Sequence, residues 1–351
     1  MRALVLGGYG VFGSLVARAL DRRGHAVTVA GRDAARARAR AHELGPAHAG
    51  LALDAADGAA VRRALESHDV LACCAGPFTA GGTQRLLEAC LDTGRHYADI
   101  AEDRGSLARG REASPHFAAR GLSALLGCSS LPGVSAALAL HARARGPAAP
   151  PVRARVSLFI GNDNAKGAAA AASFLRQMGR PIAAPQGTLR ALAGCARVDF
   201  PPPIGRRVAS EFDGPEHDLL PGLLGVSHVE TKVAFELPGA NRLLALAAGL
   251  GLRTAGGGAR WLVKVGNLTR GLGHPGGAVM AELAWADGTT RRAALLSDRD
   301  GQRLAALPCA LAIDALAARP GAGGAFLPHE LLGVDGLLGG LTAEGFALVV
   351  A

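Results

Sequence analysis

The first 128 residues alternate short apolar runs with amphipathic helical patterns, and this alternation restricts the possible folds more than any other feature of the chain. Alternating strands and helices produce a parallel sheet, because each helix returns the chain to the end where the previous strand began. Six runs are sufficient for a complete doubly wound sheet. The runs cover residues 3–6, 26–30, 51–53, 70–74, 96–100 and 122–126.

The alternation ends after Cys128, and longer strand-like runs follow a proline-rich stretch at residues 146–152. Asp287 and Gly288 separate two of these runs and predict a hairpin with a two-residue turn. We therefore expect an α/β chain with an N-terminal doubly wound parallel-sheet domain and a second mixed α/β (α+β) domain. The expected boundaries are 1–128 for a dinucleotide-binding domain, 129–305 for a substrate and dimerisation domain, and 306–351 for a C-terminal segment that packs back on the first domain.

Glycines cluster at the junction between the first strand and the first helix. Gly8, Gly10 and Gly13 fit the pattern G-x-G-x-x-G. With Gly7 in place of Gly8, the same stretch fits G-x-x-G-x-x-G. Such glycines permit a tight turn, leave the backbone open to a diphosphate and let the helix approach the strand, while the helix N-terminus attracts the negative charge. The residues expected to surround the diphosphate are Gly7, Gly8, Tyr9, Gly10, Val11, Phe12 and Gly13.

The end of the second strand indicates which dinucleotide is bound. Domains specific for NAD carry Asp or Glu at this position, where the carboxylate holds the ribose 2′-hydroxyl. This chain has Gly31 and Arg32 instead. A guanidinium can pair with a 2′-phosphate, so the sequence favours NADP(H) over NAD(H). The alternative is that Arg32 is only a solvated residue before the next helix, for which Asp33 is a good N-cap.

Two further strand ends are expected to border the cofactor. Asp54 follows the third strand and either faces the adenine or caps the helix that comes next. The turn after the fourth strand is expected to border the nicotinamide half, because ligands of such sheets lie outside the carboxyl ends of the strands. This turn contains Cys74, Ala75, Gly76 and Pro77.

The fifth strand and its end hold the candidate catalytic residues. Tyr97 and Asp99 lie on one face of the strand by two-residue alternation. Asp99 and Glu102 emerge at its carboxyl end, where either carboxylate could bind a substrate ammonium group or act as a general acid after burial raises its pKa. The alternative is that Asp99 caps the following helix and that Tyr97 belongs to the core.

Two weaker groups of polar residues follow other strands. Ser129 and Ser130 come after the sixth strand, where they could contact the nicotinamide amide or cap a helix. Asn162, Asn164 and Lys166 lie in the stretch GNDNAKG and suit either a turn or a cleft-facing role.

The composition excludes several classes of protein. The formal charge is +9, but the arginines are scattered and aromatic residues make up only 4%, so we expect no nucleic-acid binding. None of the six cysteines has a partner at metal-ligand spacing, so we expect no metal site. No apolar stretch approaches the ~20 residues needed to cross a bilayer. We expect a cytoplasmic protein that has neither a membrane association nor a signal peptide.

Several motifs of residues 3–140 resemble the saccharopine dehydrogenase (saccharopine reductase-like) family. They are GGYGVFG, AGR, CCAGPFTAGGTQ, RHYADIAED and GCSSLPGV. The resemblance implies an NAD(P)-binding domain, a mixed α/β substrate domain and hydride transfer to or from a small molecule.

The same resemblance implies an NADP(H)-dependent oxidoreductase that acts on an imine/amine couple of an amino-acid-like substrate. The alternatives are a reductase of an activated C=C or C=O bond and a non-catalytic NADP-binding sensor. A homodimer is a further expectation, since the long apolar strands of the second domain suit such an interface.

Overall fold

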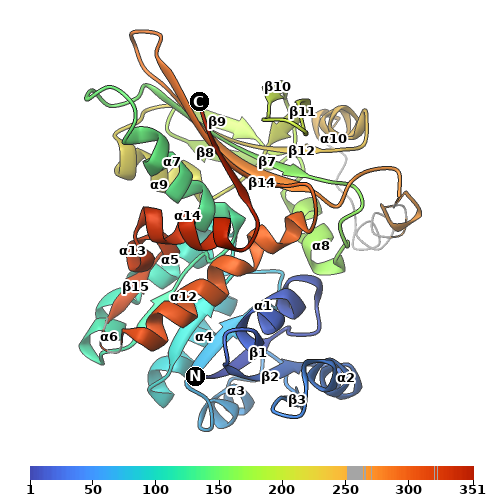
Figure 1. The fold of residues 1–351 in the computed structure, drawn as a ribbon, viewed down its shortest axis with the longest axis vertical. Helices are drawn as coiled ribbons and strands as arrows, with labels where there is room; N and C mark the ends of the chain where they lie inside the picture. The colour runs from blue at the N-terminus through green and yellow to red at the C-terminus, as the bar shows by residue number, and fades with distance from the viewer. Residues whose placement is uncertain (251–263, 265, 270, 320, 322) are drawn as a thin grey trace. The chain divides into compact units, whose positions relative to one another are not determined.

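The computed structural model covers the whole chain and describes residues 1–250, 264, 266–269, 271–319, 321 and 323–351 (Figure 1). The chain folds into two compact units. The first contains residues Met1–Gly133 and Ala305–Gly333, and the second contains Val134–Leu304 and Val334–Ala351.

The first unit is built on a parallel sheet of seven strands in the order β15-β6-β5-β4-β1-β2-β3. Between β3 and β6 this is the strand order of a dinucleotide-binding sheet, which confirms the predicted doubly wound domain. The strands are β1 (Arg2–Leu6), β2 (Ala26–Gly31), β3 (Ala49–Ala52), β4 (Val70–Cys73), β5 (His96–Asp99), β6 (Ser123–Leu125) and β15 (Gly324–Phe326).

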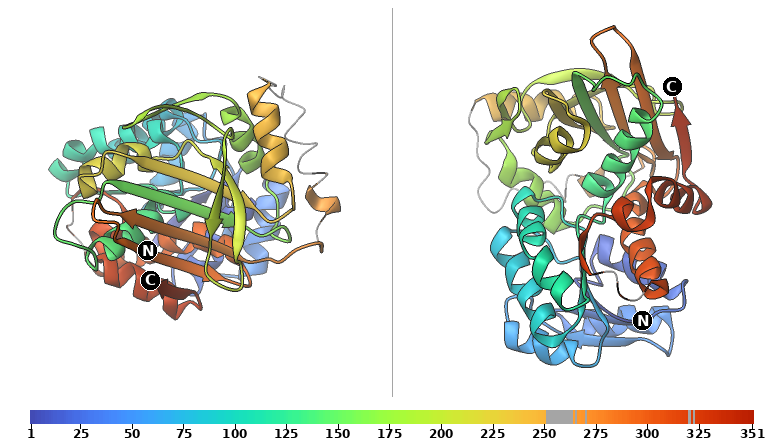
Figure 2. Two further views of the ribbon diagram at one scale, coloured as in Figure 1. Left: turned by 90° about the horizontal axis from the view of Figure 1, so that it is seen from above. Right: turned by 90° about the vertical axis from the view of Figure 1, so that its left-hand side faces the viewer.

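Helices cover both faces of this sheet, as the right-hand view of Figure 2 shows. Helices α3, α4 and α5 pack in sequence along one face, whereas α1 contacts both α2 and α12 on the other. The helices are α1 (Val11–Asp21), α2 (Ala34–Leu44), α3 (Gly58–Leu65), α4 (Ala80–Thr93), α5 (Arg104–Glu112), α6 (Ser114–Ala119), α12 (Leu307–Ala318) and α13 (Pro328–Leu332). A short π-helical segment, η1 (Ser130–Val134), follows β6 and reaches the boundary of the unit.

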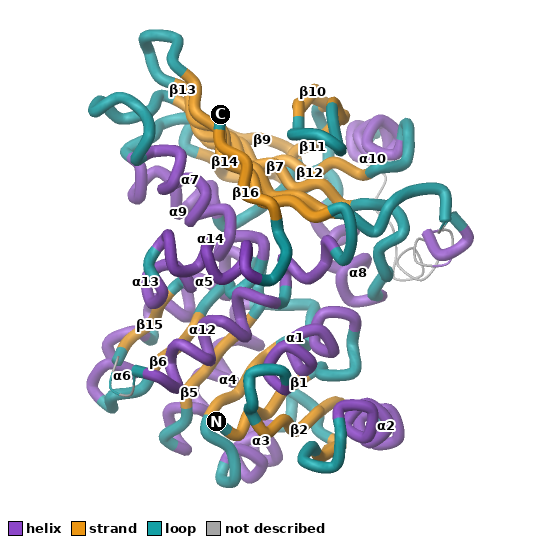
Figure 3. Tube along the Cα trace, in the orientation of Figure 1, coloured by secondary structure: helices purple, strands orange, loops and turns teal. Residues whose placement is uncertain are grey.

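The second unit contains a mixed sheet of seven strands in the order β10-β11-β12-β7-β13-β14-β16 (Figure 3). Strands β12 and β7 pair in parallel, and the other neighbours are antiparallel. This mixture confirms the predicted second α/β domain. The strands are β7 (Arg153–Ile160), β10 (Cys195–Asp199), β11 (Arg206–Glu211), β12 (Val229–Phe235), β13 (Gly277–Ala284), β14 (Thr290–Ser297) and β16 (Ala347–Val350), with β8 (Pro181–Ala184) and β9 (Gly187–Arg190) as a separate pair.

Among the described residues, the second unit also contains five α-helices. They are α7 (Ser135–Arg143), α8 (Ala168–Gln177), α9 (Glu216–Leu224), α10 (Ala240–Gly249) and α14 (Val334–Ala343), and a short 3₁₀ helix, η2 (Gly301–Ala305), reaches the unit boundary.

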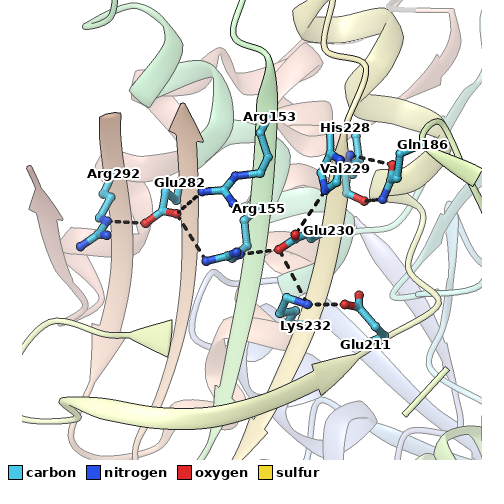
Figure 4. Close-up of polar contacts among 10 residues, drawn as sticks. All are labelled: Arg153, Arg155, Gln186, Glu211, His228, Val229, Glu230, Lys232, Glu282 and Arg292. Carbon is cyan, nitrogen blue, oxygen red and sulfur yellow. Dashed lines mark hydrogen bonds and ion pairs between the residues drawn. The ribbon is translucent and has the colours of Figure 1, made fainter. Parts of the chain in front are cut away.

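One face of the second sheet carries a network of charged side chains (Figure 4). Arg155 on β7 bonds Glu230 on β12 at 2.5 Å, and Glu230 lies 3.7 Å from the ammonium group of Lys232. Although burial opposes it, these cations lower the pKa of Glu230 to about 2. Glu282 on β13 is bonded in the same way by Arg292 at 2.5 Å. Each of these carboxylates is paired with cations of the same sheet, so we assign the network a structural role within the sheet.

The predicted hairpin of the second unit is present, but its turn differs from the expected one. Trp285 and Thr289 share a backbone hydrogen bond of 2.9 Å, which leaves three residues in the loop rather than two. Gly288 is the last of them and has φ +85°. Three-residue loops with a glycine in the left-handed conformation are the next most common type of hairpin connection. The Asp-Gly pair therefore predicted the position of the turn correctly but not its length.

The C-terminal residues 306–351 do not form one segment on the first domain. Residues up to Gly333 belong to the first unit, where β15 pairs in parallel with β6. Residues from Val334 onwards belong to the second unit, where β16 pairs with β14.

Candidate cofactor and active site

The carboxyl edge of the first sheet brings together the loops that the sequence singled out. Strands β1, β4, β5 and β6 run in the same direction and are neighbours in the sheet, so the loops that follow them meet at one edge. The winding of the sheet reverses between β1 and β4, and ligands of doubly wound sheets bind at such a switch point.

The glycine loop after β1 is held tightly against its surroundings. Gly7 has φ +79°, and a Cβ there would lie 2.9 Å from the backbone of Ala75. A Cβ on Gly13 would lie 2.2 Å from the carbonyl oxygen of Gly7, so only glycine lets α1 approach the strand this closely. Gly7, Gly10 and Gly13 fit the G-x-x-G-x-x-G spacing. Gly8 lies buried within the same turn.

The N-terminus of α1 is open to a ligand at Gly10. Gly10 is the N-cap of this helix, and no side chain caps the first turn, which also lacks acidic residues. A Cβ on Gly10 would meet only the carbonyl oxygen of Gly7, at 3.1 Å. The N–H groups of Val11, Phe12 and Gly13, which have no acceptor within the helix, therefore suit a diphosphate, and the residues present fit a dinucleotide.

Tyr9 extends from the glycine loop to the end of β2. Its hydroxyl accepts a hydrogen bond from the backbone N–H of Asp33 at 3.1 Å, and a Cβ on Gly31 would lie 2.5 Å from its ring. Asp33 is the N-cap of α2, as predicted, and accepts from two backbone N–H groups of the first turn. The neighbouring Arg32 is exposed, and no hydrogen bond or ion pair links its side chain to the described part of the chain.

Asp54, at the end of β3, is exposed and does not cap the next helix. Its carboxylate accepts a hydrogen bond from the backbone N–H of Ala56 at 3.0 Å and shapes the turn. The N-cap of α3 is Asp57, which accepts from Ala60 at 2.9 Å. The capping alternative for Asp54 was therefore wrong, because the helix begins at Gly58, three residues later than an N-cap at Asp54 requires.

The turn after β4 lies directly against the glycine loop. The N–H of Cys74 donates to the carbonyl oxygen of Leu6 at 2.8 Å, and the backbone of Ala75 limits the space at Gly7. Gly76 continues the turn through a hydrogen bond to Cys74 at 3.3 Å, and Pro77 is exposed. The loops proposed for the diphosphate and for the nicotinamide half are thus neighbours.

Asp99 is buried and fully engaged in hydrogen bonds. It is 1% exposed, and its Oδ1 accepts from the backbone N–H of Gly127 at 2.7 Å and of Ala101 at 3.1 Å. Its Oδ2 accepts from the hydroxyl of Tyr97 at 2.9 Å, which confirms that the two side chains share a face. Asp99 therefore joins the end of β5 to the loop after β6. It does not cap α5, whose N-cap is Asp103.

Burial raises the pKa of the Asp99 carboxyl from 3.8 to about 6, against the effect of its three hydrogen-bond donors. Because the folded protein binds this proton more tightly than the unfolded chain, stability falls as the pH rises from about 4 through 6. Between pH 4 and pH 7, we expect the free energy of unfolding of Asp99→Asn to rise by roughly 2–3 kcal/mol relative to that of the wild type. Chemical denaturation of both proteins across this range measures the difference, and a constant difference would contradict the raised pKa.

Glu102 forms a polar cluster with two serines near the hydrogen bonds of Asp99. Its Oε1 accepts from the hydroxyls of Ser129 and Ser130, each at 3.3 Å. The serines are 1% and 4% exposed, whereas Glu102 is only partly buried. Asp99 fixes the loop that carries both serines, so the cluster has a defined position at the carboxyl edge of β5 and β6.

A second polar cluster lies in the other unit, where β7 and β12 end. Glu236 accepts hydrogen bonds from the backbone N–H of Asn162 at 2.7 Å and of His274 at 2.8 Å. Asn164 donates to the carbonyl oxygens of Gly161 and Gly276 at 3.0 and 2.7 Å. The stretch GNDNAKG therefore orders the turns at this end of the sheet, as its turn-forming composition predicted.

Sequence reasoning missed two residues of these sites. Arg36, in the first turn of α2, stacks on Tyr9 with its guanidinium carbon 4.5 Å from the ring centroid. Glu236 accepts hydrogen bonds from both of the loops that it joins. The position of Arg36 four residues after Arg32 was the available signal, whereas nothing in the sequence links Glu236 to residues 74 and 38 positions away.

Comparison with known proteins agrees with this geometry. Residues 3–123 match the family described as saccharopine dehydrogenase NADP binding domain, which confirms the predicted family resemblance and the NADP-binding domain. Among solved structures, the chain is similar to apo saccharopine dehydrogenase (L-Glu forming) from Saccharomyces cerevisiae, with a TM-score of 0.67 at 15% identity over 100% of this chain and 99% of that chain. At this identity the likeness establishes the shared fold.

A short-chain type dehydrogenase/reductase from Mycobacterium ulcerans is a more distant neighbour, with a TM-score of 0.31 at 16% identity over 36% of this chain and 65% of that one. No curated protein sequence matches the chain. Within the described ranges, no three His, Cys, Asp or Glu side chains are grouped as metal ligands would be. The helices of the described residues include none that is long and apolar enough to cross a membrane.

Proposed function

We propose that this chain, whose residues 3–123 form an NADP-binding domain of the saccharopine dehydrogenase family, is an NADP(H)-dependent oxidoreductase. The observation that carries the proposal is the meeting of two features at one sheet edge. An uncapped glycine loop lies next to the turn after β4, and a carboxylate with two buried serines follows β5 and β6.

The residues of the first unit have separate roles in this proposal. Gly7, Gly10 and Gly13 hold the diphosphate, with Gly8, Tyr9, Val11 and Phe12 as the rest of the loop. Gly31 and Arg32 receive the ribose 2′-phosphate, and Asp54 lies on the adenine side. The nicotinamide half is bordered by Cys74, Ala75, Gly76 and Pro77. When bound, NADPH supplies the hydride, and the protein supplies position and a proton.

Glu102 is the group that we propose to face the substrate. It is partly exposed at the carboxyl edge of β5, and its Oε1 accepts hydrogen bonds from Ser129 and Ser130. A carboxylate there binds the ammonium group of an amine or transfers a proton to the nitrogen of an imine. This supports an imine/amine couple of an amino-acid-like substrate. Asp99 is buried, so we propose that it positions the loop of Ser129 rather than touching the substrate.

The consumption of NADPH with preformed imines, enones and ketones tests the proposal and separates the substrate classes. We expect oxidation of NADPH with imines that carry a carboxylate. Oxidation with enones or ketones alone would move the reaction to C=C or C=O bonds. Tight binding of NADPH without turnover in any class would leave a sensor as the function.

Glu102→Gln is expected to lower the turnover of the best substrate about 100-fold, because the amide cannot transfer a proton. The affinity for NADPH is expected to stay within about twofold, since the cofactor loops do not include this residue. Glu112→Gln, on the exposed surface of α5, is the matched control. Turnover equal to that of the control would remove Glu102 from the mechanism.

A further inference from the structure

Tyr9 and Arg36 form a stacked pair beside the end of β2. The Tyr9 ring reaches this end from the glycine loop and is fixed there by the hydrogen bond from the backbone N–H of Asp33, 3.1 Å from its hydroxyl. The Arg36 guanidinium carbon lies 4.5 Å from the centre of that ring. A guanidinium over an aromatic face is held in place by the electrostatic attraction of the ring.

The Tyr9 ring lies directly against Gly31 at the end of β2. A Cβ on Gly31 would lie 2.5, 2.8 and 2.9 Å from three atoms of the ring and its hydroxyl. Glycine at position 31 therefore lets the Tyr9 ring lie directly over the end of β2, where the ring supports Arg36.

Arg36 is also fixed through its backbone. Its N–H donates to the carboxylate of Asp33 at 3.0 Å, within the capped first turn of α2. The exposed guanidinium has no ion pair with any described residue, whereas Arg40, one turn later, bonds Glu43 at 2.5 Å. A stacked guanidinium keeps its N–H donors in the plane of the group, where they suit a phosphate.

We propose that Arg36, held flat on the Tyr9 ring, is a second cation for the 2′-phosphate of NADP(H), in addition to Arg32. This inference rests on the proposed function, since it concerns the cofactor of the same site. It adds Arg36 to the single arginine that follows β2, with Tyr9 of the glycine loop as the support of Arg36.

Calorimetric titration of the full chain with NADPH, NADH and 2′,5′-ADP tests the role of Arg36. We expect Arg36→Gln to raise the Kd of NADPH and of 2′,5′-ADP about 10- to 100-fold, because a charge-assisted hydrogen bond to the phosphate is lost. The Kd of NADH is expected to stay within about twofold, since NADH lacks this phosphate. Arg38→Gln is the matched control, because residues two apart on a helix do not share a face.

Tyr9 is tested with two variants that differ in whether the ring remains. Tyr9→Phe removes the hydrogen bond from Asp33 but keeps the ring on which Arg36 stacks, and is expected to keep most of the preference for NADPH. Tyr9→Leu removes the platform and is expected to reduce that preference at least about fivefold, since Arg36 loses its support.

An unchanged Kd of NADPH in Arg36→Gln, or equal losses for NADPH and NADH, would overturn the inference while the wild type still binds NADPH. A wild type that binds neither dinucleotide would instead overturn the proposed function itself.

Discussion

Replacing Gly10 with valine is expected to raise the Kd of NADPH at least about 100-fold, equivalent to about 2.7 kcal/mol of lost binding free energy. The valine side chain would stand at the uncapped N-terminus of α1, where the diphosphate is proposed to approach the backbone. The backbone of Gly10 has φ −75° and ψ 172°, an extended conformation that valine adopts readily. The backbone angles therefore add no strain, and the close approach of the Cβ to the Gly7 carbonyl oxygen, at 3.1 Å, is tested through the stability of the variant.

Calorimetry measures this loss, and thermal unfolding shows whether the variant is folded. Gly222→Val is the matched control, because Gly222 lies on the exposed surface of α9 with no atom within 4 Å of its Cβ position. We expect the control to bind NADPH as the wild type does. Wild-type affinity in Gly10→Val would place the dinucleotide elsewhere on the protein.

The largest expected effect on stability comes from Asp99→Ala. The substitution leaves the N–H groups of Ala101 and Gly127 and the hydroxyl of Tyr97 buried without their acceptor. An unsatisfied buried donor costs about 1–3 kcal/mol, so we expect a loss of about 3–5 kcal/mol in the free energy of unfolding. Chemical denaturation at neutral pH measures it.

Asp99→Asn separates the hydrogen bonds of this residue from its charge. The amide oxygen accepts the two backbone N–H groups, and the amide nitrogen donates to the Tyr97 hydroxyl after that hydroxyl rotates. We expect the asparagine variant to be at least as stable as the wild type at pH 7. Equal losses in both variants would show that the negative charge of Asp99, rather than its hydrogen bonds, holds the loop after β6.

The first domain was predictable because its determinants are local in the sequence. The period of its apolar runs predicts a parallel sheet, and the spacing of the glycines places the turn after β1. Asp33 follows the same logic, since an N-cap contacts backbone groups only two and three residues away. Where one loop contains several acidic residues, the sequence does not show which of them caps the following helix. The N-caps of α3 and α5 are Asp57 and Asp103, not Asp54 and Asp99.

The remaining features depend on contacts between distant segments. Asp99 accepts a hydrogen bond from Gly127, 28 positions away, and the sequence shows neither this donor nor the burial of the carboxylate. The division of the last 46 residues, 306–351, between the two units likewise follows from pairing with β6 and β14. The role of Arg36 was not predictable from the sequence, because it depends on where the Tyr9 ring lies.

Calorimetric titration of the wild-type chain with NADPH and, separately, with NADH tests the central claim most directly. We expect saturable binding of one NADPH per chain, with a Kd for NADH at least about tenfold higher, because Arg32 meets a phosphate only in NADPH. Equal affinities would contradict the assignment of the end of β2 to the 2′-phosphate. Binding of neither dinucleotide would contradict the oxidoreductase itself.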